Sequence, residues 1–200
     1  MSAQTPRFKT TDFSEAKVEE WNPGHISFGR GFKCNRSEFL SHWKRRIPRD
    51  VDGQMGRCWD IIEDSKLVGY ITLLADRLQV LDTERHPKRI LKKKEKIEYD
   101  SFPAIKIGLL AADRRAHRAG KRLMLWAIEY VATEIAPKLG ARFITVDAAY
   151  DRDAVPEPYD ISGYYANLGF EFAIIDEELP PPQERPFRTM YFDLKNAVRD

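Results

Sequence analysis

Basic residues surround a single glycine where a long segment with helical periodicity begins, in DRRAHRAGKRLMLWAIEYVA from Asp113 to Ala132. A helix start exposes unpaired backbone N–H groups and the positive end of the helix dipole, so it attracts anions. Gly120 would let a ligand approach the backbone, and arginine and lysine bind phosphate oxygens. The pattern predicts a site for a pyrophosphate or a 3′-phosphate. The alternative interpretation is a solvated basic helix start in which the glycine is merely tolerated.

The segments around this stretch alternate as strand, helix and strand. AIKIGLLAA, after Pro103, is almost entirely apolar and has the length of a strand covered on both faces. From Ala119 to Ile135 apolar residues recur at spacings of three and four, and Pro137 with Gly140 is expected to close this helix. ARFITVDAA supplies a second strand. This order predicts a right-handed βαβ unit with parallel strands, whose anion site lies at the carboxyl end of the first strand.

The rest of the chain predicts further strands and helices around this unit. CNRSEFLSHWKRRI suits a short helix capped by Asn35 or Ser37. GRCWDIIED and KLVGYITLLADRL, joined by a turn, suit an antiparallel hairpin. ISGYYANLGFEFA suits a short helix that turns at Gly169 into a strand, and RPFRTMYFDL suits a terminal strand. The predicted fold class is therefore α/β, with a mixed sheet and helices on both faces.

Length and composition predict a single domain over residues 1–200, because 200 residues with 42% hydrophobic content can bury one sizeable core. A highly charged segment without sustained periodicity predicts an exposed insertion at about 77–102. Its basic run from Lys88 to Lys96 has two interpretations, a solvated loop or a contact with transfer RNA.

Several function classes have no support in the sequence. The formal net charge of +2 is nearly balanced, so no overall field favours nucleic acid or membrane. No apolar run reaches the length of a signal-peptide core or a membrane span, which predicts a cytoplasmic protein without membrane contact. Cys34 and Cys58 lack metal-ligand spacing and do not cluster with histidines. We therefore expect reduced thiols and no metal.

The basic loop and five further segments resemble the GNAT superfamily of acetyl-CoA-dependent N-acetyltransferases. In HRAGKR, His117 stands at the Gln/Arg position of the family's phosphate loop and Gly120 at the first glycine, whereas Arg122 stands where a second Gly or Ala is expected. GYYANLGF is similar to the family's Phe-Tyr-three residues-Gly-Phe element. FKCNRSEFL, FPAIKIGLLAAD, RFITVDA and RTMYFDL are similar to a bacterial subgroup that includes aminoacyl-tRNA-acetylating toxins. The matching segments run from Phe32 to Leu194.

The resemblance implies a site for acetyl-CoA as co-substrate. The first strand of the βαβ unit is expected to splay from its neighbour, so that pantetheine pairs with backbone groups near Leu110 and Ala112. A backbone N–H around Leu110 would stabilise the oxyanion. The phosphates would bind the loop, at His117, Arg118, Ala119, Gly120, Lys121 and Arg122. The side chain of Arg122 would either crowd the pyrophosphate or pair with a phosphate oxygen.

The resemblance places the catalytic tyrosine at Tyr165, where a phenol in contact with the departing thiolate could protonate it. The alternative is an aromatic side chain that only packs a helix face. AIKIGLLAA contains no carboxylate to act as general base. Asp113 suits a loop cap, so Asp147 is the better candidate for binding or deprotonating the acceptor amine, with a structural aspartate as its alternative. Catalysis through water also remains open.

The function predicted from these residues is transfer of an acetyl group to a primary amine by direct attack on the thioester. The acceptor would be a small molecule, a peptide or an aminoacyl-tRNA, the last as in the toxin branch. The alternative is a non-catalytic acyl-CoA-binding module. Dimers are common in this superfamily, so a homodimer is also expected.

Overall fold

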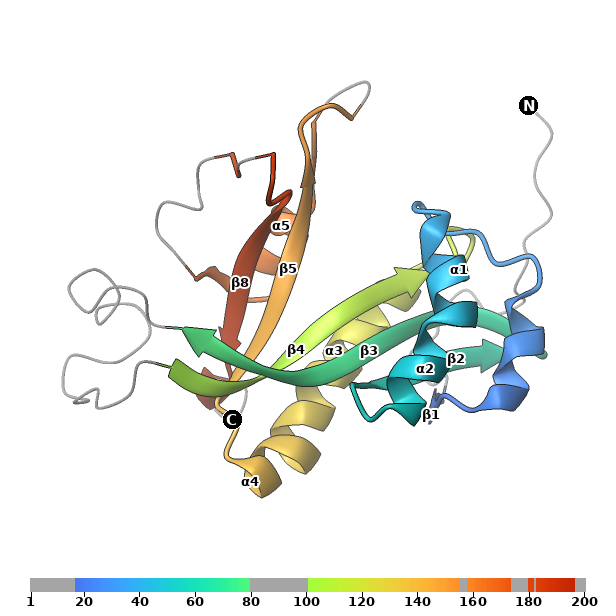
Figure 1. The fold of residues 1–200 in the computed structure, drawn as a ribbon, viewed down its shortest axis with the longest axis horizontal. Helices are drawn as coiled ribbons and strands as arrows, with labels where there is room; N and C mark the ends of the chain where they lie inside the picture. Colours follow the sequence, from blue (N-terminus) through green and yellow to red (C-terminus); the bar gives the residue numbers. More distant parts are fainter. Residues whose placement is uncertain (1–16, 80–100, 155–157, 174–179, 182, 197–200) are drawn as a thin grey trace. The chain divides into compact units, whose positions relative to one another are not determined.

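A mixed β-sheet organises the chain in the computed structural model (Figure 1). The structure describes residues 17–79, 101–154, 158–173, 180–181 and 183–196. The strands in these ranges are β1 (Val18–Glu20), β2 (Arg57–Glu63), β3 (Lys66–Gln79), β4 (Ser101–Ala112), β5 (Phe143–Asp151), β6 (Tyr159–Asp160), β7 (Glu171–Phe172) and β8 (Phe187–Asp193). Their hydrogen-bonded order is β1-β2-β3-β4-β5-β8-β7, and β6 pairs with β5.

Two compact units divide the chain. Unit 1 contains the described residues of Met1–Leu74 and Gly108–Glu129, and unit 2 contains those of Ala75–Ile107 and Tyr130–Asp200. Both β3 and β4 contribute residues to each unit.

Unit 1 contains the predicted hairpin and the predicted N-terminal helix. β2 and β3 pair antiparallel through a turn whose Asp64 and Ser65 have φ of 48° and 56°. The helix is α1 (Glu38–Arg45), followed by α2 (Ile47–Asp52). Ser37 occupies the N-cap position of α1, but its side chain makes no capping hydrogen bond. The hairpin and the helix are confirmed, and the predicted side-chain cap at Ser37 is not formed.

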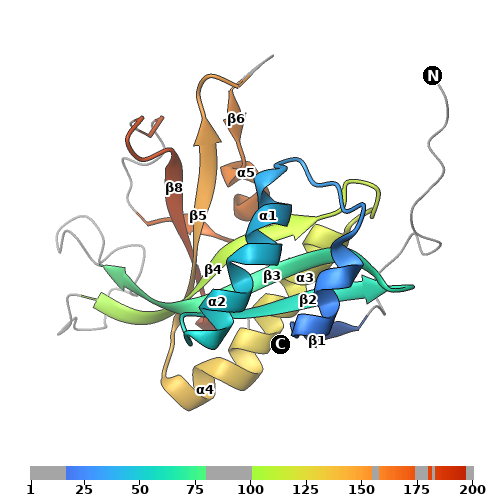
Figure 2. The ribbon, with the colours of Figure 1, turned by 45° about the vertical axis from the view of Figure 1, so that its right-hand side comes forward.

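The strands of unit 1 are covered on both faces, as predicted. Figures 1 and 2 show α1 and α2 on one face and α3 (Ala119–Tyr130) on the other. Trp43 and Ile47 from the α1–α2 segment pack with Leu67 and Tyr70 of β3 in one buried cluster. On the α3 side, the rings of Trp59 and Trp126 lie 5.5 Å apart. Ala111 of β4 belongs to the same buried cluster, so the carboxyl-terminal end of β4 packs in the layer under α1 and α2.

The helix after the basic loop continues further than its proline predicts. After α3 it passes through a π-helical turn (Val131–Ile135) into α4 (Ala136–Leu139). Pro137 lies in the first turn of α4 and does not end the helix, because proline is tolerated where a helical segment begins. The helix ends at Gly140, whose φ of 69° is the left-handed conformation that favours glycine.

Unit 2 contains the predicted parallel pair. β4 and β5 pair parallel from Ala104 with Phe143 to Ile107 with Val146. β5 also pairs antiparallel with β8, which pairs with β7. Phe143 and Tyr191 lie at the core of this unit, with their rings edge to face and 5.7 Å apart.

The predicted insertion at about 77–102 begins and ends within strands. β3 extends to Gln79 and β4 begins at Ser101. Residues 80–100, including the basic run from Lys88 to Lys96, lie outside the described residues.

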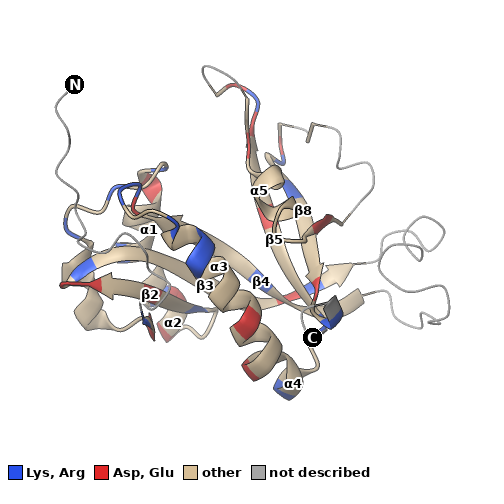
Figure 3. Ribbon diagram, turned by 180° about the vertical axis from the view of Figure 1, so that it is seen from behind, with Lys and Arg blue, Asp and Glu red and all other residues tan. Residues whose placement is uncertain are grey.

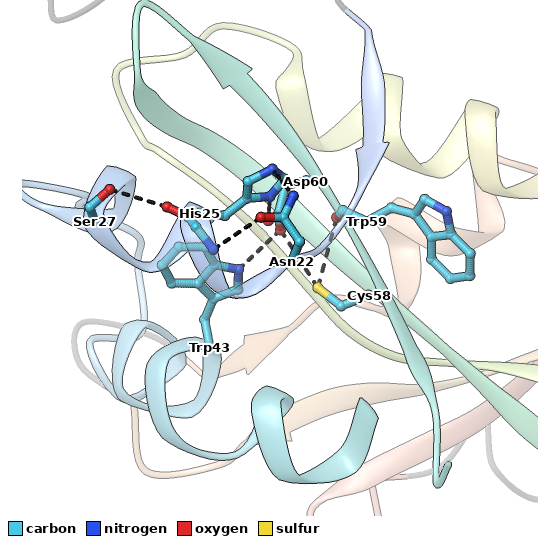
Figure 4. Close-up of polar contacts among 8 residues, drawn as sticks. Asn22, His25, Ser27, Trp43, Cys58, Trp59 and Asp60 are labelled. Atoms are coloured by element: carbon cyan, nitrogen blue, oxygen red, sulfur yellow. Dashed lines mark hydrogen bonds and ion pairs between the residues drawn. The ribbon is translucent and has the colours of Figure 1, made fainter. Parts of the chain in front are cut away.

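A buried polar network joins the N-terminal segment of unit 1 to β2 (Figure 4). Asp60 is completely buried and its carboxylate accepts hydrogen bonds from His25 Nδ1, at 2.8 Å, and from Trp43 Nε1, at 3.0 Å. Asn22 Oδ1 accepts from the Gly24 N–H, so the Asn22 amide nitrogen faces His25 Nε2, 2.7 Å away. This orientation makes Nε2 an acceptor and leaves the imidazole proton on Nδ1. Burial raises the pKa of Asp60, and the bonds from His25 and Trp43 act against that rise.

We expect Asp60→Ala to lower the free energy of unfolding by about 2–4 kcal/mol, because it leaves two buried N–H donors without their acceptor. Urea denaturation at neutral pH measures this loss. Asp52→Ala, which removes an exposed carboxylate from α2, is the control and should change stability by less than about 0.5 kcal/mol. Equal stabilities of the two variants would contradict a structural role for the network.

Candidate functional site

Asp113 anchors the loop between β4 and α3. Its carboxylate accepts hydrogen bonds from the Arg115 amide and guanidinium and from the Lys33 amide, at 2.9–3.0 Å. Arg115 also donates to the Gly31 carbonyl at 2.6 Å. Burial acts to raise the pKa of Asp113, but these hydrogen bonds outweigh it and hold the pKa below its usual value. Asp113 therefore has the loop-capping role that its sequence position predicts.

The loop presents a row of unused backbone donors. The amide N–H groups of His117, Arg118, Gly120 and Lys121 form no hydrogen bond with any described residue. The Ala119 N–H makes a long bond of 3.4 Å to the Ala116 carbonyl. Arg118 has a φ of 61°, and a left-handed residue beside helical ones turns successive N–H groups toward one concavity. The loop is thus a candidate site for an anion.

Gly120 leaves space above this row of donors. A Cβ atom built on Gly120 would meet only the Cβ of Ala112, at 3.8 Å, which is an ordinary van der Waals contact. No side chain of the loop fills that position. A phosphate group could therefore approach the backbone at Gly120.

The edge of β4 before the loop also has donors that β3 does not use. The Leu109 N–H donates to Thr72 Oγ1, and the Asp113 N–H donates to the Val68 carbonyl, both on β3. Amide groups alternate between the two edges of a strand, so the N–H groups of Leu110 and Ala112 face away from β3. The parallel register with β5 ends earlier, at Ile107. The predicted pantetheine contacts at Leu110 and Ala112 thus have backbone groups of the required direction.

Positive charge gathers around the free amides. Figure 3 shows lysine and arginine along the β4–α3 loop and at the start of α3. Arg114, Arg118 and Lys121 belong to this group. Arg115, also part of the basic stretch, donates from its guanidinium to Asp113 and to the Gly31 carbonyl.

Arg122 is half-buried, and its Nε atom, which is fully buried, finds no hydrogen-bond partner among the described residues. A guanidinium with an unused donor favours pairing with a phosphate oxygen over obstruction of the site. We expect Arg122→Gly to weaken acetyl-CoA binding about 10-fold, measured by isothermal titration calorimetry. Arg122→Lys should retain most of the affinity because it keeps the charge. Tighter binding by the glycine variant would show instead that the arginine crowds the site.

Tyr165 lies in unit 2 on α5 (Ser162–Ala166), a short helix closed at both ends. Asp160 accepts a hydrogen bond from the Ser162 amide at the start of α5. At its end, Gly169 has a φ of 89°, and the Phe170 N–H returns to the Tyr165 carbonyl at 3.1 Å. The chain turns at Gly169 as predicted, and glycine suits this position because few other residues adopt that φ.

The Tyr165 side chain is buried, with 7% of the residue exposed, and its ring packs against Tyr164 and Phe170. Its hydroxyl has no hydrogen bond to any described residue. Burial raises the pKa of Tyr165 well above its usual value, and the charges of Tyr164, Tyr159 and Asp147 add to the rise. The phenol therefore stays protonated at neutral pH.

Asp147 is already engaged. Its carboxylate pairs with Lys106 Nζ on β4 at 2.5 Å and accepts from Thr189 Oγ1 on β8 at 3.2 Å. Neither Lys106 nor Thr189 is among the residues that sequence reasoning selected. The parallel register pairs Lys106 with Thr145, and Asp147 lies two residues further along β5 on the same face. The strand register therefore brings Lys106 to Asp147.

The segment from Asp151 to Asp160, which also contains Asp153 and Glu157, is acidic and only partly described. Asp160 pairs with Arg188 of β8 at 3.1 Å, while Glu157 lies outside the described residues. Burial opposes the ionised form of Asp160, but hydrogen bonds from Ser162 and the charge of Arg188 hold its pKa below the usual value.

The described residues show neither a metal-binding cluster nor a membrane-spanning helix. They contain no group of three or more His, Cys, Asp or Glu side chains that could hold a metal ion. Cys34 and Cys58 are free thiols. None of the described helices is both long and apolar enough to cross a membrane.

Comparison with solved structures identifies the architecture. The chain is similar to a structure described as a bacterial toxin, with 18% identity, a TM-score of 0.63, and coverage of 92% of this chain and 94% of that one. A structure of AtaTR bound with AcCoA matches with 17% identity and a TM-score of 0.64, over 90% of this chain and 94% of the other. The chain has the GNAT fold. This confirms the predicted fold class, and the predicted likeness to the toxin branch holds at the level of the fold.

A third similar structure, of AtaT complexed with acetyl-methionyl-tRNAfMet, has 17% identity and a TM-score of 0.62, and the match covers 90% of this chain and 96% of that one. No protein-family model and no curated protein matches the sequence.

Proposed function

We propose that this protein is an acetyl-CoA-dependent N-acetyltransferase that transfers acetyl directly to a primary amine. The observation that carries the proposal is the row of unused amides at His117, Arg118, Gly120 and Lys121, in a GNAT fold. AtaTR, a structure of the same fold, is described as bound with AcCoA. The residues present fit a diphosphate, because backbone donors, positive charge and open space at Gly120 coincide.

In the proposed reaction, some residues bind acetyl-CoA and others stabilise the charge that develops on the thioester oxygen. The β4–α3 loop would hold the diphosphate, and the outward N–H groups of Leu110 and Ala112 would hold the pantetheine arm. A Leu110 N–H directed at the thioester oxygen would stabilise the oxyanion that forms when the amine attacks the carbonyl carbon. As that intermediate collapses, the C–S bond breaks and the acetyl group remains on nitrogen.

Tyr165 would supply the proton for the departing thiolate. Its hydroxyl has no competing hydrogen bond to a described residue, and its raised pKa keeps it protonated at neutral pH. The amine proton would pass to Asp147 or to water. Because Lys106 and Thr189 both contact Asp147, its role is better described as binding and orienting the acceptor amine than as free proton acceptance.

The acceptor that we propose first is an aminoacyl-tRNA, as in the toxin branch. AtaT, of the same fold, is described in complex with acetyl-methionyl-tRNAfMet. In this chain, four exposed basic residues lie along the α1–α2 segment of unit 1, where they could contact phosphates: Lys44, Arg45, Arg46 and Arg49. Peptides and small amines are the other acceptor classes, and a homodimer remains a prediction.

Transfer of labelled acetyl from acetyl-CoA to a panel of aminoacyl-tRNAs, peptides and small amines tests the proposal. We expect transfer to at least one amine, and a salt-sensitive shift of aminoacyl-tRNA in gel titrations at two salt concentrations. Tight acetyl-CoA binding without transfer to any acceptor would support the alternative of a non-catalytic acyl-CoA-binding module. Absence of acetyl-CoA binding would refute both.

A further inference from the structure

A second concavity lies within unit 1, apart from the phosphate loop. It has a volume of about 240 Å³ and lies between the α1–α2 segment and strands β2, β3 and β4. Its lining includes Ile47 and Val51 from α2, Leu74 from β3 and Leu109 from β4. These four side chains are apolar, and His42, Cys58 and Thr72 are the polar side chains that line the pocket away from its charged residues. Most of the interior therefore favours an apolar group.

Charged side chains surround the mouth of this pocket. Arg46, Asp50 and Arg57 line it, with 68%, 37% and 45% of their side chains exposed, whereas Ile47 at the floor is 1% exposed. Arg46 Nε and Asp50 Oδ2 form an ion pair at 3.4 Å, and Arg57 Nη1 donates a hydrogen bond to the Val51 carbonyl. A ligand that enters must therefore be apolar at one end and polar where it meets the mouth.

The size of the pocket limits the apolar end to one small group. A cavity of about 150 Å³ holds benzene, and pockets for drug-sized ligands span roughly 300–1,000 Å³. With about 240 Å³, this pocket suits one amino-acid side chain and is too small for a nucleoside. An amino acid combines such a side chain with a polar main chain.

The backbone around the pocket connects it to the proposed chemistry. Leu109 and Thr72 line the pocket, and the Leu109 N–H donates to Thr72 Oγ1 at 2.8 Å. The next residue of β4, Leu110, carries the N–H proposed to bind the thioester oxygen. An acceptor whose side chain lies against Leu109 would therefore have its main chain close to the strand that bears that group.

The geometry points to the pocket as the binding site for the side chain of the acceptor: an α-amino acid with a compact apolar side chain, whose α-amine receives the acetyl group. This inference rests on the proposed acetyltransferase function. The cations at the mouth, Arg46 and Arg57, suit the carbonyl or carboxyl-derived end of the amino acid. An acyl chain longer than acetyl is the competing occupant, and the acyl-CoA preference of the pocket variants distinguishes it from an amino-acid side chain.

Competition between amino-acid amides tests the inference. With saturating acetyl-CoA, we expect kcat/KM for L-methioninamide to exceed that for glycinamide roughly 10- to 100-fold. Val51→Phe should reduce this ratio at least about 10-fold by filling the pocket. Leu74→Phe fills the same space from β3 and replaces the first variant if that variant does not fold. Met55→Phe, at a side chain that is 72% exposed and does not line the pocket, is the matched control and should keep the ratio.

The possible outcomes separate this inference from the proposed function. Equal rates with both amides, or a ratio that Val51→Phe leaves unchanged, would overturn the inference while the enzyme remains an acetyltransferase. A changed preference among acetyl-, propionyl- and butyryl-CoA with unchanged acceptor preference would assign the pocket to the acyl chain and also overturn it. If no amine is acetylated, calorimetric titration of L-methioninamide decides: saturable binding lost in Val51→Phe supports the pocket, and no binding refutes it.

Discussion

Tyr165→Phe is expected to lower turnover by about 10²-fold while leaving acetyl-CoA affinity almost unchanged. The substitution removes only the hydroxyl, and that hydroxyl has no hydrogen bond to any described residue that its loss would break. The ring contacts with Tyr164 and Phe170 remain, so α5 should keep its packing. The effect should therefore fall on the chemical step, where a proton must reach the departing thiolate.

Steady-state kinetics with saturating acetyl-CoA and calorimetric titration of acetyl-CoA measure the two quantities. Tyr164→Phe is a closely matched control, because its buried hydroxyl also lacks a hydrogen-bond partner but lies one residue away from the family's catalytic position. It should keep its turnover within about threefold. If Tyr165→Phe turned over as fast as the wild type, Tyr165 would have no part in the mechanism.

The raised pKa of Tyr165 also determines the expected pH profile. A group whose pKa is raised keeps its proton to higher pH, so the phenol remains a donor throughout the neutral and mildly alkaline range. The acceptor amine reacts only in its neutral form, so the rate should rise with pH. We expect no alkaline decline in kcat below about pH 10 for the wild type.

Gly120→Asp is expected to weaken acetyl-CoA binding by roughly 10³-fold. The new carboxylate would stand among the free amides where the diphosphate is proposed to bind. Two like charges about 4 Å apart near a protein surface repel by about 4 kcal/mol, which corresponds to such a factor. Space for the new Cβ is available, since its nearest neighbour would be the Ala112 Cβ at 3.8 Å. The protein should therefore still fold, as a thermal melt can verify.

Two further variants show whether position or charge causes the loss. Leu125→Asp adds the same charge to an exposed position of α3, beyond the loop, and should leave acetyl-CoA affinity within about twofold. Gly120→Ala adds a Cβ without charge and should give an intermediate loss. Unchanged affinity in Gly120→Asp would remove the β4–α3 loop from the binding site.

The local features of the fold were predictable because they depend on short-range physics. The period of about 3.6 after Ala119 and the apolar run before Asp113 identified α3 and β4, since each pattern reflects one buried face. Gly140 and Gly169 were recognisable as turn residues because glycine favours helix ends, and both adopt positive φ in the structure. The helix end expected at Pro137 was placed too early, because proline is tolerated in the first turn of the next helical segment.

The candidate site was predictable only in its outline. The position of Gly120 selected the loop, and the resemblance of GYYANLGF selected Tyr165. Each of these two motifs is a contiguous run of residues, which makes it recognisable in the sequence. The partners that give these groups their properties are distant: Lys33 is 80 residues from Asp113, and Lys106 is 41 residues from Asp147. No period or local motif links such pairs.

By itself, the sequence determined which segments become strands and helices, and where a glycine and positive charge meet a helix start. Only the tertiary structure decided which polar groups already have a hydrogen-bond or ion-pair partner and which remain available to a ligand. Arg115 donates hydrogen bonds to Asp113, and Asp147 forms an ion pair with Lys106, while the amides around Gly120 form no hydrogen bond with a described residue. The physical reason is that a polar group's availability depends on whether folding brings a partner within hydrogen-bond distance, and strand register decides this between residues far apart in the chain.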